Sequence, residues 1–164
     1  MHHLKLNKLS IQVGQTAPVI SLFDTDKNSV VLGGPSDKNT VVLFFPLAFT
    51  GVCTAELCNI RDNIASYNNT NAQVIGLSVD SLFVLGKFKD EQSLNFPLLS
   101  DFNKEAAGAY GVLYETFPAF GMQGVSKRAA FVLDKAGVVQ YAEVCPTPGD
   151  LPSFTAIQAC LAGL

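Results

Sequence analysis

Two nearly continuous apolar runs mark the centre of the chain. The segments Thr40–Phe45 (TVVLFF) and Gln73–Val79 (QVIGLSV) are rich in β-branched residues, as are strands that are buried on both faces of a sheet. Between them runs an apolar stripe of Cys53, Leu57, Ile60, Ile64 and Tyr67. Its members are three or four residues apart, which predicts one helix with the stripe on its buried side. A strand, a helix and a second strand in this order predict a βαβ unit.

Shorter patterns on either side of this unit predict the remaining elements. Ala17–Phe23 and Ser29–Leu32 are separated by the turn-rich segment DTDKN, which predicts an N-terminal β-hairpin. Three further strands are predicted at Phe96–Ser100, Ala129–Leu133 and Val138–Val144. Three further helices are predicted at about Leu82–Leu94, Lys104–Tyr110 and Leu151–Leu161. Together these elements predict an α/β fold whose mixed central sheet is parallel at the crossover helix and antiparallel at hairpins.

Composition narrows the class of protein. The 164 residues contain no internal repeat and no linker, so we expect one domain over residues 1–164. The formal net charge of −3 is far from the basic profile of nucleic-acid binders, which argues against nucleic acid as a partner. The sequence has neither the apolar core of a signal peptide nor a run of eighteen apolar residues. We therefore expect a soluble, cytoplasmic protein with no membrane contact.

The four cysteines are too few and too unevenly spaced for a disulfide scaffold, and a core of this size does not need one. Cys53 and Cys58 are one residue further apart than a structural zinc pair usually allows, and no similar pair follows. His2 and His3 are adjacent near the terminus and do not make a site by themselves. We therefore assign no metal and expect the cysteines to serve chemistry or core packing.

Cys53 is the strongest candidate for chemistry because of where the patterns place it. Pro46 cannot continue a central strand, and Thr50 with Gly51 is a suitable helix start, so Cys53 falls in the first helical turn. First-turn amides have no partner within the helix, and with the helix dipole they favour a thiolate over a thiol. The end of a buried strand is also where an α/β sheet opens its ligand crevice. The alternative is that Cys53 is one more small buried apolar side chain.

A reactive thiolate at this position needs a cation as well. A helix N-terminus contributes roughly 0.3–1 kcal/mol and at most about 2, whereas one pKa unit corresponds to about 1.4 kcal/mol. Lys127 and Arg128 directly precede the apolar run Ala129–Leu133, and a strand entry can bring such a side chain to the crevice. Arg128 is the better candidate because its planar fork can hold a thiolate and a substrate oxygen together. The alternative is a solvated charge at the end of a strand.

These residues carry a resemblance to a known family. Pro46, Thr50 and Cys53 form P-x-x-x-T-x-x-C, which resembles the peroxidatic motif of the peroxiredoxins. The likeness continues in FFPLAFTGVC, NFPLLSDFNKEAAGAYGV and KRAAFVLDKAGVV, and it covers about Val13 to Val144. The sequence as a whole is similar to AhpE-like enzymes. The C-x-x-x-x-C spacing is similar to the PrxQ or bacterioferritin-comigratory-protein branch.

The resemblance implies a thioredoxin-like fold with an N-terminal extension and no metal or organic cofactor. It implies a homodimer that reduces hydrogen peroxide or organic hydroperoxides, with thioredoxin or a similar thiol as reductant. Under this resemblance Cys53 is the peroxidatic nucleophile, Thr50 orients the peroxide and Pro46 shields the pocket. Arg128 is the guanidinium that activates the thiolate. Glu56 either accepts hydrogen bonds from Arg128 or is a first-turn acid that the helix dipole favours.

The resemblance also suggests which thiol reacts with the oxidised cysteine. Attack on a peroxide leaves Cys53 as a sulfenic acid, which a second thiol can resolve before overoxidation. Cys58 is the PrxQ-like candidate. Five residues along a helix give a rise of about 7.5 Å, beyond the roughly 7 Å between Cα atoms that a disulfide tolerates. We therefore predict that the reduced protein is helical through Cys53–Cys58 and that oxidation unwinds at least one turn.

Other interpretations of the cysteines stay open. If Cys58 is a bystander, the enzyme has one reactive cysteine and uses an external thiol. A thiol–disulfide oxidoreductase would favour C-x-x-C spacing, and a redox sensor would oxidise Cys53 without useful turnover. Cys145 lies in V-C-P, which resembles the resolving motif of typical two-cysteine peroxiredoxins, but it comes only seventeen residues after Arg128. Cys160, on the predicted C-terminal helix, is interpreted as packing.

Overall fold

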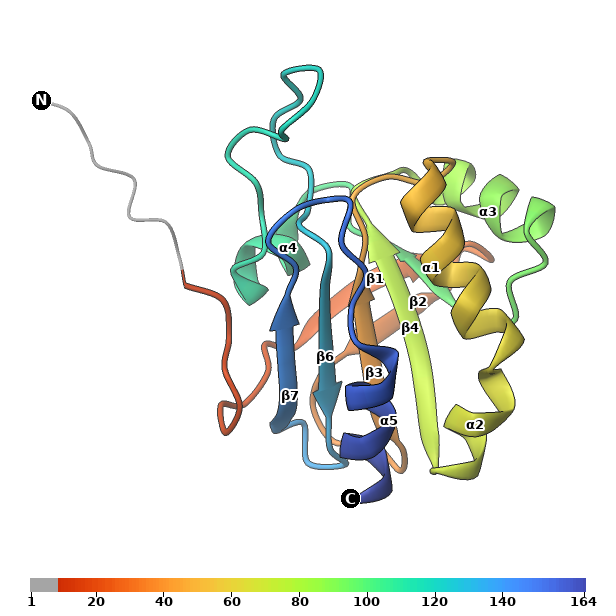
Figure 1. Cartoon of the computed structure of the whole chain (residues 1–164), viewed down its shortest axis with the longest axis vertical. Helices are drawn as coiled ribbons and strands as arrows, with labels where there is room; N and C mark the ends of the chain where they lie inside the picture. Colours follow the sequence, from red (N-terminus) through yellow and green to blue (C-terminus); the bar gives the residue numbers. More distant parts are fainter. Residues whose placement is uncertain (1–8) are drawn as a thin grey trace, which may run out of the picture.

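The computed structural model describes residues 9–164, and within this range seven strands form one mixed sheet in the order β2-β1-β5-β4-β3-β6-β7 (Figure 1). The strands are β1 (Ile20–Asp24), β2 (Ser29–Leu32), β3 (Asn39–Phe44), β4 (Ala72–Ser78), β5 (Leu98–Ser100), β6 (Ala129–Leu133) and β7 (Val139–Val144). The helices are α1 (Gly51–Asp62), α2 (Ile64–Asn69), α3 (Leu82–Glu91), α4 (Glu105–Tyr110) and α5 (Phe154–Ala162). None of these helices has the length and apolar character needed to cross a membrane. His2 and His3 lie outside the described residues.

The centre of the sheet is the predicted βαβ unit. β3 and β4 pair in parallel, and every residue of β3 is buried, as expected of a strand with a neighbour on each side and a core on each face. β6 pairs antiparallel with β3, and β7 pairs antiparallel with β6. The hairpin of β1 and β2 joins the sheet through β5. The mixed α/β sheet and its N-terminal hairpin extension are therefore confirmed.

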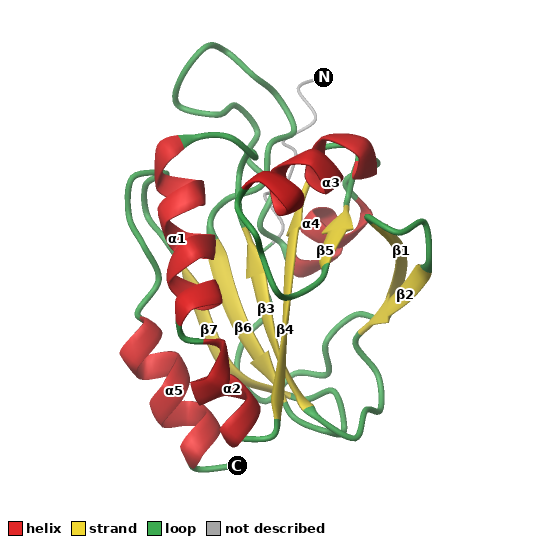
Figure 2. Cartoon of the chain, turned by 90° about the vertical axis from the view of Figure 1, so that its right-hand side faces the viewer, coloured by secondary structure: helices red, strands yellow, loops and turns green. Residues whose placement is uncertain are grey.

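Two apolar cores lie on the two faces of this sheet. One core joins α1, α2, α3 and α5 to the sheet and includes Cys53, Leu57 and Ile60. The other core packs α4 and the N-terminal hairpin against Phe44 and Phe131. Figure 2 shows α1, α2 and α5 on one side of the sheet and α4 on the other. Because successive side chains of a strand point to opposite faces, the same central strands contribute to both cores.

Two strands are at least two residues shorter in the structure than the hydrophobic pattern predicts. β1 lacks the three residues before Ile20, and β5 lacks the two residues before Leu98. Pro18 and Pro97 lie in these missing segments. Proline has no backbone N–H to donate to a ladder, so each strand begins after its proline.

The single helix predicted after β3 is two helices in the structure. Asn63 separates α1 from α2, and its side chain donates to the carbonyl of Asn59 (Nδ2 to O, 2.8 Å). A local side-chain bond of this kind competes with regular helix geometry. Tyr67 is buried as the stripe predicts, but Ile64 is only half-buried. The break lies more than two turns after the start of α1, so it leaves the first turn intact.

Candidate active site

Helix α1 begins just beyond the carboxyl end of β3, at the edge of the sheet that β3 and β4 share (Figure 1). Thr50 is the N-cap residue and has an extended backbone. Its hydroxyl donates to the carbonyl of Leu47 (2.7 Å) and makes no capping bond to the helix. The first-turn amides therefore have no side-chain acceptor from the N-cap residue. They are free to stabilise an anion at Cys53, which lies in this turn.

The loop between β3 and α1 is held by residues that the sequence did not point out. Asp80 follows β4, and its carboxylate accepts a hydrogen bond from the backbone N–H of Ala48 (2.8 Å). Ser126 donates its hydroxyl to the carbonyl of Phe45 (3.1 Å). Pro46 is buried between these two anchored positions. The available signal for Asp80 was its place after a strand parallel to β3, because carboxyl ends of parallel strands share one edge.

The structure brings Arg128 to the sulfur of Cys53. The Nη2 atom of Arg128 donates to Cys53 Sγ (3.3 Å) and to the carbonyl of Pro148 (2.9 Å). Cys53 and Arg128 are each only 1% exposed. Burial by itself lowers the pKa of Arg128, but the charges of Glu56 and Cys53 outweigh burial and raise this pKa. Arg128 is therefore a buried cation beside the thiol and not a solvated charge at the end of a strand.

Glu56 completes this buried cluster. It lies three residues after Cys53 on the buried face of α1, beyond the first turn, and is 0% exposed. The Nη1 atom of Arg128 donates to Glu56 Oε2, so of the two interpretations of Glu56 the structure has the hydrogen-bonded one. Burial raises the pKa of Glu56 to about 7; the charge and hydrogen bond of Arg128 oppose this shift, and Glu143 adds to it. The carboxyl group therefore titrates near neutral pH.

Cys58 lies on the same helix but faces a different neighbour. It is half-buried, and its Sγ donates to the side-chain carbonyl of Gln92 (3.6 Å) at the end of α3. Helix α1 is continuous from Cys53 to Cys58, and all four cysteines are free. The structure thus has the helical, reduced segment that the cysteine spacing predicts.

Cys145 borders the cluster, although its place in the sequence did not suggest this. Its backbone N–H donates to the carbonyl of Arg128 (2.9 Å), one step beyond the paired ends of β6 and β7. Directly opposite residues of an antiparallel pair share a face. Burial, and then the charges of Glu143 and Glu56, raise the pKa of Cys145 to about 11, so this thiol is neutral at neutral pH. Cys160 packs against the core that contains α1, as its packing interpretation predicts.

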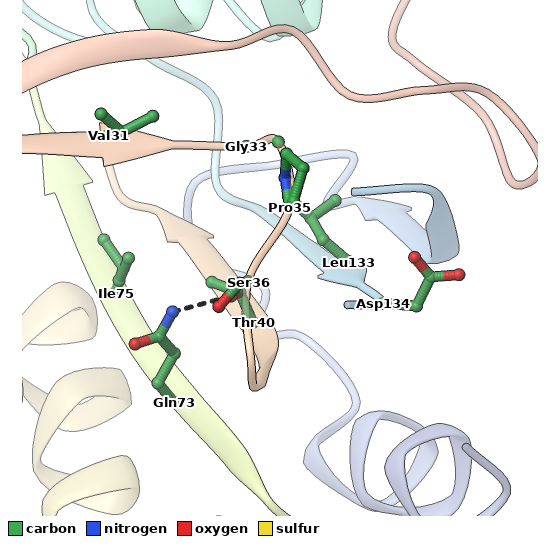
Figure 3. Close-up of a pocket in the computed structure, with 10 residues that line it drawn as sticks. Val31, Gly33, Pro35, Ser36, Thr40, Gln73, Ile75, Leu133 and Asp134 are labelled. Atoms are coloured by element: carbon green, nitrogen blue, oxygen red, sulfur yellow. Dashed lines mark hydrogen bonds between the residues drawn. The ribbon is translucent and has the colours of Figure 1, made fainter. Parts of the chain in front are cut away.

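A second polar region lies at the opposite end of the central strands (Figure 3). It is a hollow of about 110 Å³ that Thr40, Gln73 and Asp134 help to line, and its lining contains neither a cysteine nor a basic residue. Gln73 Nε2 donates to Thr40 Oγ1 (3.0 Å), the dashed line in Figure 3. Within residues 9–164 no group of three His, Cys, Asp or Glu side chains could hold a metal ion. A nucleophile beside a cation is found at the α1 end.

Comparison with known proteins finds relatives over most of the chain. The model of the AhpC/TSA family matches residues 13–142. Alkyl hydroperoxide reductase E of Mycobacterium tuberculosis is 35% identical over 144 residues, which cover 86% of this chain and 90% of the relative. The residues matched by the family model include Cys53, Glu56 and Arg128.

Solved structures extend this likeness to the fold. The crystal structure of a peroxiredoxin-like protein from Aquifex aeolicus has a TM-score of 0.87 at 25% identity and covers 96% of this chain and 90% of that one. Peroxidoxin BcpB from Mycobacterium tuberculosis has a TM-score of 0.81 at 26% identity and covers 94% of this chain and 98% of that one. These matches confirm the thioredoxin-like α/β fold. The chain therefore belongs to the AhpC/TSA family and is a peroxiredoxin.

Proposed function

We propose that the chain reduces hydrogen peroxide and organic hydroperoxides, with the thiolate of Cys53 as the nucleophile. The contact between Arg128 Nη2 and Cys53 Sγ (3.3 Å), in the first turn of α1, carries this proposal. A buried cation and a helix N-terminus both favour the thiolate, which is the reactive form of cysteine. The substrate class is supported by a relative that is named an alkyl hydroperoxide reductase.

In the proposed first step the sulfur of Cys53 attacks one oxygen of the peroxide. An S–O bond forms while the O–O bond breaks, so negative charge develops on the departing oxygen. Arg128 and the first-turn amides are donors already held in place, and such donors need no reorganisation as the charge develops. Thr50 can turn its hydroxyl from the carbonyl of Leu47 to the peroxide. Pro46, which is buried within the loop between β3 and α1, would shield the sulfur from water.

Cys58 is the proposed resolving cysteine, and its reaction with Cys53 requires α1 to open, because an intact helix holds the two Cα atoms too far apart. Helix α1 lacks a side-chain N-cap, and such a cap stabilises a helix by about 1 kcal/mol. Oxidation of Cys53 to a neutral sulfenic acid also removes the negative charge on the sulfur, which Arg128 stabilises in the thiolate. Opening is opposed by Leu57, which is 0% exposed and whose exposure would cost about 1.5–3 kcal/mol.

A thioredoxin-like dithiol is the proposed reductant, because thiol–disulfide exchange with a Cys53–Cys58 disulfide regenerates both thiols. In this cycle the protein needs no metal and no organic cofactor. The cycle is intrasubunit, so it needs no cysteine from a second copy of the chain.

We also propose that two copies of the chain associate. Phe23, Phe83 and Phe102 are 55%, 70% and 61% exposed, and they border one cavity of about 460 Å³. Exposed aromatic side chains that gather in one place are typical of an interface. Sedimentation should show a dimer that Phe83→Ser weakens. A protein that stays monomeric at all concentrations would exclude this part of the proposal.

The resolving step is tested by treating the reduced protein with one equivalent of peroxide and mapping its cysteine linkages by mass spectrometry. The two-cysteine cycle predicts a Cys53–Cys58 disulfide and faster hydrogen exchange in α1 after oxidation. A persistent Cys53 sulfenic acid with Cys58 free would instead establish a one-cysteine cycle with an external thiol. Equal protection of α1 in both redox states, with the disulfide present, would exclude unwinding.

Turnover separates the peroxidase from the other interpretations of Cys53. A peroxidase consumes peroxide catalytically when thioredoxin is supplied, and Cys53→Ser abolishes this activity. A redox sensor would consume about one peroxide per protein and then stop. A thiol–disulfide oxidoreductase would reduce a protein disulfide in the absence of peroxide.

A further inference from the structure

The guanidinium of Arg128 holds two acidic groups at once. Its Nη2 donates to Cys53 Sγ (3.3 Å), and its Nη1 donates to Glu56 Oε2. Cys53 and Arg128 are each 1% exposed, and Glu56 is 0% exposed. If both acidic groups were ionised, the cluster would carry one net negative charge, and a buried charge without a partner costs several kcal/mol. The cluster therefore favours one anion and one proton over two anions.

The surroundings of Glu56 offer no second positive charge. The titratable groups that face Glu56 or Arg128 within residues 9–164 are Cys53 on α1, Glu143 on β7, Cys145 beyond β7 and Tyr114 in the loop before β6. Each of these groups is neutral or negative in its ordinary forms. Glu143 increases the repulsion and so raises the pKa of Glu56 further.

One carboxyl oxygen of Glu56 lacks a hydrogen-bond donor in the described part of the chain. Glu56 Oε1 is buried and has no hydrogen-bond partner among the described residues. A carboxylate oxygen without a donor pays a larger desolvation cost than a neutral carboxyl group does. The thiol of Cys53, in contrast, faces Arg128 Nη2 in the first turn of α1. An anionic sulfur beside Arg128 and a protonated Glu56 carboxyl are therefore the favoured combination in this cluster.

We propose that Cys53 and Glu56 share one proton across Arg128 in the reduced protein, and that Glu56 gives this proton to the oxygen that departs when Cys53 is oxidised. The inference deepens the proposed peroxidase function and rests on it. Glu56 then has two roles: it orients Arg128 through their hydrogen bond, and it acts as the acid catalyst of the first step.

The proposed step balances in atoms and in charge. The sulfur of Cys53 supplies the electron pair that forms the S–O bond, the O–O bond breaks, and the departing oxygen leaves as hydroxide or alkoxide. The proton of Glu56 moves to that oxygen, directly or through one bridging water, and gives water or an alcohol. Cys53 is oxidised to the sulfenic acid and the peroxide is reduced. The cluster is neutral before the step as thiolate, carboxyl and guanidinium, and neutral after it as sulfenic acid, carboxylate and guanidinium.

Transfer of the Glu56 proton lowers the cost of forming the departing anion in a buried site. A departing anion in a site with little water is costly to form, and an acid of matched pKa lowers that cost. An acid that titrates near pH 7 is protonated when the reaction begins and can still release its proton.

Proton uptake from solvent tests the inference directly. All proteins carry Cys58→Ser, so that oxidation stops at Cys53, and each is mixed with one equivalent of hydrogen peroxide in weak buffer with a pH indicator. At about pH 6 the Glu56 carboxyl supplies the proton, and the carboxylate left behind stays ionised because an anionic sulfur no longer competes with it for Arg128, so the parent protein should take up almost none. At about pH 8 Glu56 is ionised beforehand, so uptake should approach one proton per oxidised Cys53. Glu56→Gln should take up about one proton at both pH values.

The controls keep the outcomes separate. Glu91→Gln makes the same chemical change at an exposed end of α3 and should behave as the parent. Peroxide consumption and Cys53 sulfenic acid are measured in the same samples. If the parent protein itself fails to react, the result contradicts the proposed function. Normal reaction with equal proton uptake in the parent and in Glu56→Gln would overturn only the shared proton.

If Glu56→Gln does not fold, an infrared difference spectrum of the parent protein before and after oxidation tests the same inference. Oxidation of the parent protein should remove one carboxyl C=O band and add carboxylate bands, because Glu56 loses its proton. Cys53→Ser should show neither change. Oxidation of Cys53 without loss of a carboxyl band would overturn the inference.

Discussion

The two ends of the central strands differ in how their polar groups are satisfied. At the end drawn in Figure 3, Gln73 and Thr40 bond to each other, and Asp134 accepts hydrogen bonds from the backbone of Ala136 (2.9 Å) and Val138 (3.0 Å). At the α1 end, the buried atoms Glu56 Oε1 and Arg128 Nε have no partner within residues 9–164. Satisfied polar groups stabilise a fold, whereas unsatisfied buried ones cost free energy and tend to mark functional sites.

The same contrast appears in the two carboxyl groups. Desolvation opposes ionisation at both. At Asp134, hydrogen bonds from Val138, Gln140 and the neighbouring turn outweigh it, and the pKa is lowered. At Glu56, burial outweighs Arg128 and raises the pKa to about 7. One end of the sheet therefore holds a turn whose carboxylate is stabilised in its charged form, and the other holds a carboxyl group that can exchange its proton near neutral pH.

The largest expected effect is that of Cys53→Ser. A serine hydroxyl is not ionised at neutral pH, so peroxidase activity should fall at least about 10³-fold. Steady-state peroxide consumption measures this loss. Cys160→Ser changes the same atom on α5, where the thiol packs against the core, and its activity should stay within about twofold. Comparable activity of Cys53→Ser and the parent would place the nucleophile elsewhere.

Arg128→Met tests the cation at the α1 end. Loss of the donor that contacts Cys53 Sγ (3.3 Å) should lower the rate of Cys53 oxidation about 10²–10³-fold. Lys127→Met is the matched control, because Lys127 is a neighbouring cation that lies over the ring of Tyr114 (5.8 Å); we expect less than about a twofold change. Equal losses in the two variants would mean that general positive charge, and not this contact, matters.

Glu56 predicts a pH dependence of folding stability. Its pKa rises from 4.5 in the unfolded chain to about 7 in the folded protein, so the stability it contributes is fully present below pH 4.5. This contribution, roughly 3 kcal/mol, is lost as the pH rises through about 7, because the folded state must then release the proton as well. Denaturant unfolding of the parent and of Glu56→Gln should differ by this slope between the two pH values. Parallel curves would show that the pKa of Glu56 does not change on folding.

The smallest expected effect belongs to the opposite end of the strands. Gln73→Met removes the bond to Thr40, which is 6% exposed, and should lower the free energy of unfolding by about 1–3 kcal/mol. Peroxidase activity should not change. A loss of activity in Gln73→Met without a loss of stability would show that the two ends of the sheet are coupled.

Much of the fold was predictable because its elements are encoded locally. The apolar runs around β3 and β4 and the spacing of the residues on α1 identify strand, helix and strand without further information. The errors have local causes of another kind. Pro18 and Pro97 shorten strands, and Asn63 divides a helix through its own side chain. Hydrophobic spacing does not record these backbone effects.

The site was predictable only in part. Cys53 could be placed at a helix start and Arg128 at a strand entry. The place of Asp80 after a parallel strand was a weaker signal, and Ser126 and the nearness of Cys145 to Arg128 had none. Each of these contacts depends on which strands lie beside one another. A sequence pattern identifies strands more readily than it orders them.

The sequence by itself determined the α/β pattern, the helix that begins near Thr50 and the motif that resembles the peroxiredoxins. The tertiary structure decided which groups meet. Cys53 and Arg128 are 75 positions apart and come within 3.3 Å because β6 pairs beside β3, the strand that leads into α1. Their common burial with Glu56 also shifts the pKa of that carboxyl group. Local periodicity carries information about neighbours along the chain, whereas desolvation and charge pairing depend on neighbours in space.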